Sequence, residues 1–93
     1  MYSSGGVQIR TNGKEASINL DISNVSFTNS KQTLTTIPSQ YAPVTNYIHS
    51  RAHPNNRDAW IELEDNTIYK WASSANTIGV FCTIPTYPLH TPL

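Results

Sequence analysis

The stretch AWIELEDNTIYKW, residues 59–71, is the part of the sequence that decides the fold. Two runs of β-branched and aromatic residues, 59–63 and 67–71, stand on either side of a short polar segment. Asp65 and Asn66 in this segment tolerate the positive φ angles that a tight turn between antiparallel strands requires. The stretch therefore predicts a β-hairpin with Asp65 and Asn66 as its two loop residues.

The register of this hairpin divides its side chains between two faces, because neighbouring residues of a strand point in opposite directions. With Asp65 and Asn66 in the loop, Trp60 lies opposite Trp71. One face is aliphatic and consists of Ala59, Ile61, Leu63 and Ile68. The other face carries aromatic rings and carboxylates, namely Trp60, Trp71, Tyr69, Glu62 and Glu64. A longer loop with a bulge would shift the pairing and mix the two faces.

Short alternating runs of the same kind recur along the chain, and no window has the period of an amphipathic helix. The expected strands cover residues 7–10, 17–22, 25–28, 32–37, 45–50, 59–63, 67–72 and 77–84, with turn sequences such as Asn12-Gly13 and Ser23-Asn24 between them. This pattern predicts an all-β domain, either a small antiparallel β-sandwich or a jelly-roll-like barrel. We assign residues 7–93 to that single domain and residues 1–6, with their SSGG segment, to a linker or junction.

Composition and charge argue against several classes of function. The chain has 93 residues and a formal net charge of zero, and its Lys and Arg residues are scattered. Nucleic-acid binding, which needs a clustered basic surface, is therefore not expected. Membrane insertion is not expected either, because no apolar run reaches the roughly 20 residues that span a bilayer. Cys82 is the only cysteine, so no intrachain disulfide or cysteine-based zinc site can form, and no cofactor motif is present.

The run 77–84 predicts contact with another subunit. So many short strands in a small chain leave a thin core, which oligomerisation would supplement. The run is apolar on both alternating faces, and such a strand is either central in a sandwich or pressed against a partner. The residues expected at an oligomer interface are Ile78, Val80, Phe81 and Ile84.

Three segments resemble the C-terminal head domains of bacteriophage tail and baseplate proteins, of the type found in phages of Gram-positive bacteria. TLTTIPSQYAPV (33–44) is similar to a Pro-Tyr-Pro segment of that family, which precedes a strand, a polar loop and a hairpin like AWIELEDNTIYKW. ASINLDISNVSF (16–27) resembles the family's opening strands. The resemblance covers residues 16–87, although the hairpin turn lacks the usual glycine. It implies a homotrimeric head in the virion, folded in the host cytoplasm, that joins other tail or baseplate proteins and binds cell-wall polysaccharide or teichoic-acid components.

Two sets of residues are candidate contacts for such a saccharide. The rings of Trp60, Tyr69 and Trp71 offer surfaces on which sugar C–H faces stack, and Glu62 and Glu64 offer acceptors for hydroxyl groups. The alternative is that these rings pack in the core or against another subunit. The polar loop HSRAHPNNRD (49–58) is either a recognition loop or a solvated crossover. As a recognition loop it would use His49, Arg51, His53, Asn55, Asn56, Arg57 and Asp58.

Catalysis and metal binding are less favoured interpretations. Asp58, Glu62 and Glu64 could supply the carboxylate pair of a glycosidase, but a small open sheet offers no evident cleft for the bond between them. His49 and His53 have metal-ligand spacing, but they lie in a loop and not on a helix with further ligands. We therefore predict a saccharide-binding domain and not an enzyme. The alternative is a structural module of a tail fibre or baseplate that binds no ligand.

Overall fold

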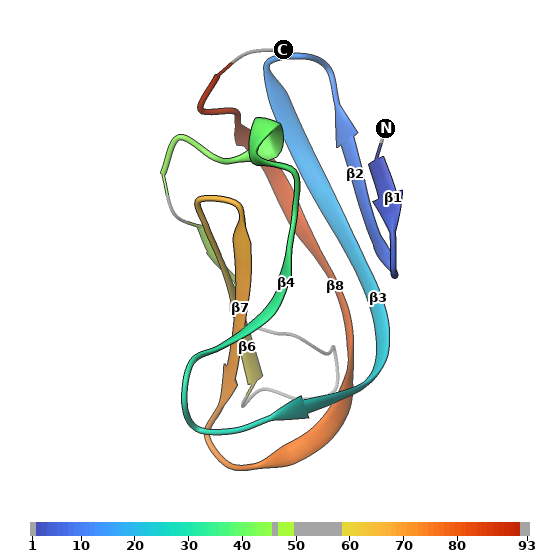
Figure 1. The fold of residues 1–93 in the computed structure, drawn as a ribbon, viewed down its shortest axis with the longest axis vertical. Coiled ribbons are helices and arrows are strands. Elements are labelled where there is room, and N and C mark those ends of the chain that lie inside the picture. Colours follow the sequence, from blue (N-terminus) through green and yellow to red (C-terminus); the bar gives the residue numbers. More distant parts are fainter. Residues whose placement is uncertain (1, 46, 50–58, 92–93) are drawn as a thin grey trace.

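The chain forms two antiparallel sheets that face each other as a sandwich (Figure 1). The computed structural model describes residues 2–45, 47–49 and 59–91. Each sheet has four strands, in the orders β1-β2-β3-β8 and β4-β7-β6-β5. The prediction of an all-β sandwich is therefore confirmed.

The elements follow the sequence pattern in most places. They are β1 (Tyr2–Ser4), β2 (Val7–Thr11), β3 (Glu15–Phe27), β4 (Gln32–Thr36), the 3-10 helix η1 (Ser39–Tyr41), β5 (Tyr47–His49), β6 (Ala59–Glu64), β7 (Thr67–Ala72) and β8 (Asn76–Pro88). The chain crosses between the sheets from β3 to β4 and returns from β7 to β8. The long strands β3 and β8 run side by side along the sandwich (Figure 1).

The core lies between the sheets and is built from the inward-facing half of each alternating strand. Its fully buried side chains are mostly branched aliphatic ones, which suit a pleated surface. The largest of them are Phe27, Ile9, Ile18, Leu20, Ile61, Leu63, Ile68, Ile84 and Val80. Six of these nine side chains come from the first sheet and three from the second, and together they form one hydrophobic layer.

The N-terminal segment expected as a linker is partly a strand, so the assignment of residues 1–6 is corrected. Tyr2–Ser4 form β1 and pair with β2 around a turn at Gly5 and Gly6. These glycines have φ values of 55° and 85°, which glycine adopts readily. A Cβ on Gly6 would collide with the Asp21 carbonyl oxygen, so the turn packs directly against β3.

The expected turn at Ser23-Asn24 is a bulge within one long strand. The sequence predicts separate strands over residues 17–22 and 25–28, but residues 17–22 and 25–27 belong to one strand, β3. The pairing with β8 shifts between Ile22 and Val25, and Asn24 takes a φ of 57°. The bulge accommodates the turn-forming residue within the strand. The strand bends there, and its pairing with β8 continues beyond it.

Tyr41 and Tyr87 close one end of the sandwich. Both are buried, and the Tyr87 hydroxyl donates a hydrogen bond of 2.7 Å to the Tyr41 carbonyl oxygen. The backbone around Pro43 also bridges to Leu89. The IPSQYAP segment thus serves as scaffold at this end.

Burial raises the pKa of Tyr87 to about 12 and that of the Cys82 thiol to about 11.

These raised pKa values predict a loss of stability at alkaline pH. The ordinary pKa values are 10.0 for Tyr87 and 9.0 for Cys82, so the unfolded chain loses these protons first. The contribution of these two groups to the free energy of unfolding should therefore be fully present below about pH 9. It should decrease as the pH rises toward about 12. Urea unfolding followed by circular dichroism at several pH values would measure it.

Tyr87→Phe and Cys82→Ala separate the two contributions. Tyr87→Phe should cost about 1–3 kcal/mol at pH 8, because the buried Tyr41 carbonyl loses its donor. Its remaining stability should vary less than that of the parent between pH 10 and 12. Cys82→Ala should reduce the pH dependence of the free energy of unfolding only between about pH 9 and about pH 11. If Tyr87→Phe kept the full alkaline loss, Tyr87 would not be responsible for it.

Candidate functional site

The β6–β7 hairpin has the register that the sequence predicts. Trp60 pairs with Trp71, and Glu62 pairs with Tyr69. Asp65 has a φ of 55°, as a tight hairpin turn requires. The inward face of the hairpin is aliphatic and fully or almost fully buried, with Ala59, Ile61, Leu63, Ile68 and Ala72. The aromatic and acidic residues are therefore on the outer face of the second sheet.

Trp60 and Trp71 form a stacked pair on this outer face. Their ring centroids are 6.3 Å apart and the rings are inclined by 19°. This is an offset-stacked geometry that aromatic pairs prefer. Both side chains are partly exposed, and neither belongs to the buried core. The pair thus presents an apolar surface to the outside of the protein.

Lys31 forms ion pairs with the two glutamates of this outer face. Its Nζ is 2.6 Å from an oxygen of Glu62 and 3.1 Å from an oxygen of Glu64. The same Nζ lies 4.5 Å from the centre of the Tyr69 ring. Hydrogen bonds to Glu62, and then to Glu64, raise the pKa of Lys31. Glu62 is only 8% exposed, so the lysine supplies the partner that a buried carboxylate needs.

The sequence analysis did not find Lys31. It lies just before β4, and Glu64 is 33 residues away along the chain. No local pattern connects a lysine in that position with the hairpin; only the pairing of β4 with β7 brings it there. The carboxylates that we expected to be open acceptors are therefore partly engaged by a cation of the same chain.

Glu62 and Glu64 lie on one strand and share one lysine. A ligand over this face would meet both carboxylates from the same side. Glycoside hydrolysis uses carboxylates that flank the bond, so this arrangement offers nothing in favour of that reaction.

Together the Trp pair, Tyr69 and the charged cluster form what we call the aromatic face, which is suited to stacking a flat ligand and to hydrogen bonding at its edge.

The recognition loop stays a prediction. Arg51, His53, Asn55, Asn56, Arg57 and Asp58 lie outside the described residues, as does the side chain of His49. The backbone of His49 ends β5 and pairs with Ile61. Within residues 2–45 and 59–91, no group of three or more His, Cys, Asp or Glu side chains could hold a metal ion.

The expected interface residues on β8 have different environments. Val80 and Ile84 have no exposed surface in the single chain, because they fill its own core. They are therefore wrong as interface residues. Ile78 is partly buried and packs against the core. Phe81 alone of the four is exposed, at 38%, on the outer face of the first sheet.

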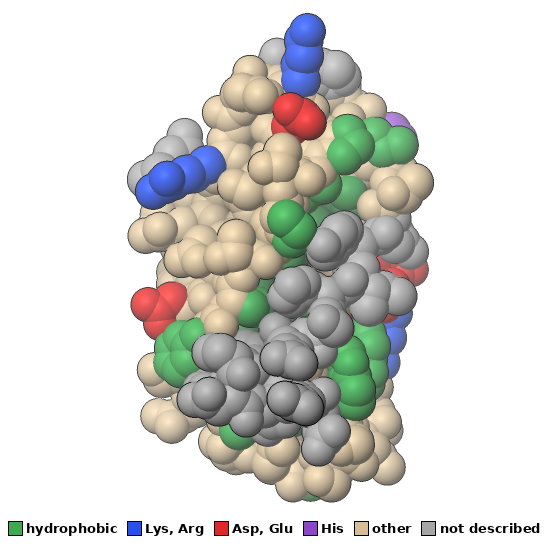
Figure 2. Space-filling model, turned by 180° about the vertical axis from the view of Figure 1, so that it is seen from behind, with side chains coloured by type: hydrophobic (Ala, Val, Ile, Leu, Met, Phe, Trp, Pro, Cys, Tyr) green, Lys and Arg blue, Asp and Glu red, His purple; other side chains and the backbone are tan. Residues whose placement is uncertain are grey.

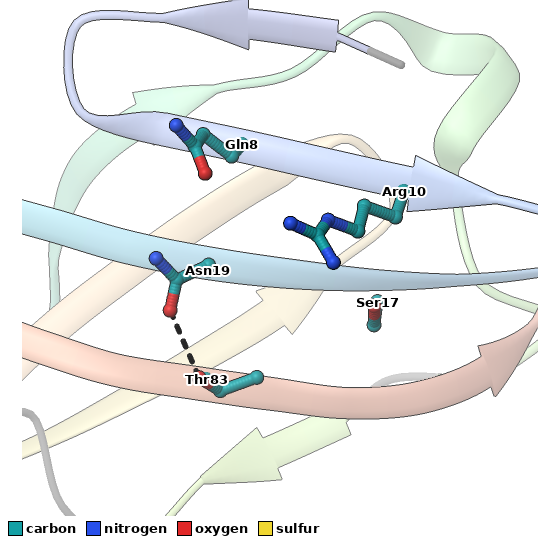
Figure 3. Close-up of a pocket in the computed structure, with 5 residues that line it drawn as sticks. All are labelled: Gln8, Arg10, Ser17, Asn19 and Thr83. Carbon is teal, nitrogen blue, oxygen red and sulfur yellow. Dashed lines mark hydrogen bonds between the residues drawn. The ribbon is translucent and has the colours of Figure 1, made fainter.

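The outer face of that first sheet carries a polar pocket that the sequence analysis missed (Figure 3). It has a volume of about 270 Å³ and is lined by Gln8, Arg10, Ser17, Asn19 and Thr83. Strands β2, β3 and β8 supply these side chains. Each alternates with a buried residue, which is an ordinary surface pattern, so only the strand pairing shows that they converge. We refer to this site as the Arg10 pocket.

Comparison of the chain with protein-family models, with curated proteins and with solved structures found no match. None of the helices in the described part of the chain is long and apolar enough to cross a membrane. On the side of the molecule seen in Figure 2, the few charged side chains are scattered among uncharged groups. The chemistry of the two outer faces must therefore be judged from their own side chains.

Removal of the Lys31 charge should destabilise the fold, because Glu62 would keep a poorly solvated carboxylate without a cation. We expect Lys31→Gln to lower the melting temperature at low salt. Adding Glu62→Gln should recover part of the loss, since a neutral amide needs no counter-charge. Differential scanning calorimetry of the two single variants and the double variant would measure the coupling.

Lys14→Gln is the matched control. Lys14 is also exposed, but its side chain forms no ion pair with the described residues. Its loss should leave the melting temperature almost unchanged. If Lys31→Gln melted with the parent at low salt, the contact with Glu62 would contribute nothing to stability.

Proposed function

We propose that this chain is a saccharide-binding domain that recognises a bacterial cell surface, as the receptor-binding head of a phage tail or baseplate protein. The observation that carries the proposal is the stacked Trp60–Trp71 pair outside the core. The resemblance of residues 16–87 to phage head domains supplies the biological setting: a virion protein beside other tail or baseplate proteins. The antiparallel sandwich is compatible with that setting.

The chemistry of the aromatic face fits a sugar. The C–H face of a pyranose ring is apolar and flat, and it stacks on indole rings in the way that other flat ligands do. The Lys31–Glu62–Glu64 cluster lies beside the rings and offers both donors and acceptors to hydroxyl groups. An apolar platform with polar groups at its edge is the usual composition of a small-molecule site.

The alternative is an assembly module whose aromatic face packs against another subunit. The charged cluster disfavours a subunit contact at the Lys31 end of the aromatic face. A subunit covering that end would have to remove the exposed charges of Lys31 and Glu64 from water, and the desolvation cost can exceed the gain from the ion pairs. A saccharide can leave such a cluster hydrated. We therefore favour a ligand over a permanent protein partner here.

Trp71→Ala should weaken saccharide binding by roughly 1–3 kcal/mol, by analogy with aromatic stacking on other flat ligands. Its folding cost should stay below the about 3–5 kcal/mol of a core aromatic deletion, because the ring is partly exposed. Trp71→Phe, which keeps a ring, should lose less binding. Calorimetric titration with a saccharide selected on a glycan array would measure the affinities.

Tryptophan fluorescence gives an independent reading of the same face. Partly exposed indoles should emit to the red of core indoles and be quenched by iodide, and bound saccharide should protect them. Blue-shifted emission that resists iodide and does not respond to cell-wall saccharide would remove the support for this site.

The same proposal includes a homotrimer, which the resemblance implies. Light scattering at micromolar concentration should then give three times the mass of the 10.3 kDa chain. Because Val80 and Ile84 are in the core, the trimer contacts must use other side chains than those of the buried face of β8. A monomer that unfolds cooperatively would contradict the trimer and leave saccharide binding to be decided by the Trp71 variants.

A further inference from the structure

The Arg10 pocket is built by three neighbouring strands. Arg10 pairs with Ser17, and Asn19 pairs with both Gln8 and Thr83. These pairings bring the five side chains onto one face within adjacent rows of the sheet. In Figure 3 the Arg10 side chain lies along the sheet, and its guanidinium reaches over β3 toward Asn19.

The guanidinium of Arg10 has no partner among the described residues. It forms no hydrogen bond, ion pair or ring contact there. Glu15 and Asp21 are the nearby carboxylates that line the adjoining hollows, and neither pairs with it. A guanidinium has five N–H donors in a planar fork that matches a carboxylate or phosphate group. The pocket therefore contains an unused site for an oxyanion.

The groups around Arg10 suit hydroxyl groups. Thr83 donates to the Asn19 side-chain oxygen at 3.0 Å, which orients that amide and leaves its NH₂ group available. The side chains of Gln8 and Ser17 form no hydrogen bonds with the described residues. Amides and a hydroxyl beside one cation can hold a ligand that carries a single anionic group and several hydroxyls.

The hollow continues in both directions along the sheet. A neighbouring pocket of about 320 Å³ shares Asn19 and Thr83 and extends to Asp21 and Phe81. Another of about 200 Å³ shares Arg10 and Ser17 and extends to Glu15. One pocket is near the lower end of ligand sites, about 300 Å³, and the adjoining hollows add space along the sheet. The acids at its ends disfavour a polyphosphate.

We propose that the Arg10 pocket binds an acidic saccharide, whose carboxylate or phosphate group is held by Arg10 and whose hydroxyls contact Gln8, Ser17 and Asn19. The site is on the opposite sheet from the aromatic face and does not depend on it.

Amide NMR titrations with three probes test the proposal: glucuronate, glucose 6-phosphate and glucose. We expect glucuronate, glucose 6-phosphate or both to shift the resonances of residues 8, 10, 17, 19 and 83, while glucose shifts them much less. A response to glucuronate alone identifies a carboxylate ligand, and a response to the phosphate alone identifies a phosphorylated one. If neither anionic probe shifted these resonances, or if glucose did so equally, the proposal would be overturned.

Arg10→Gln should weaken binding of the effective probe about tenfold or more, because a charge-assisted bidentate contact is lost. Arg10→Lys should recover only part of the affinity, since an ammonium is not a planar fork. Arg10 is exposed and unpaired, so circular dichroism should show both variants folded.

Lys14→Gln removes the same charge from the β2–β3 turn, outside the pocket lining, and should bind like the parent. Equal weakening by Lys14→Gln and Arg10→Gln would indicate general charge attraction and overturn the site. Trp71→Ala should leave probe binding at this pocket intact, so a failure of the aromatic face and a failure of the Arg10 pocket are distinguishable.

Discussion

The structure depends on the turn at Asp65-Asn66, because that turn sets which side of the β6–β7 hairpin faces the core. Asp65 takes a positive φ of 55°. Asn66 is held from outside the hairpin: its carbonyl accepts from the Ile37 amide at 2.8 Å, and its side chain donates to the Ile37 carbonyl at 3.2 Å. A slip of one residue would put Trp60 into the core and Ile61 into water. The core and the aromatic face therefore share one geometric cause.

This dependence explains what could be predicted from the sequence. The alternation of apolar and polar residues and the turn chemistry at Asp65 are local, and together they determine the pairing of Trp60 with Trp71. The all-β class follows from the same kind of local signal repeated along the chain. The outward position of the rings was predictable because the aliphatic residues between them leave only one stable orientation.

The features that could not be predicted are those decided by a partner strand. Asn24 is of a residue type that is typical of turns. Because β8 pairs with β3 on both sides of this position, the strand bends at a bulge and continues. Pro85 looks like the end of a strand, but it falls in a stretch where β8 has one more residue than β3, and a missing N–H is tolerated at such a bulge. Lys31 acquires its carboxylate partners from β6, far along the chain, and Thr83 of the distant strand β8 completes the pocket around Arg10.

The formal net charge of zero conceals two different electrostatic situations. Lys31 is shared by Glu62 and Glu64, so one of the two negative charges on the aromatic face is compensated within the chain. Arg10 has no partner among the described residues, and its field extends into the polar hollow around it. Salt screens exposed charges over roughly 10 Å at 0.1 M, so ionic strength acts on the exposed Lys31–Glu64 ion pair and on Arg10. Stacking on the indoles comes from apolar contact and is largely independent of salt. In the binding that we propose, the two outer faces of one small sandwich would contact different parts of a glycan, one its C–H surfaces and the other its charge.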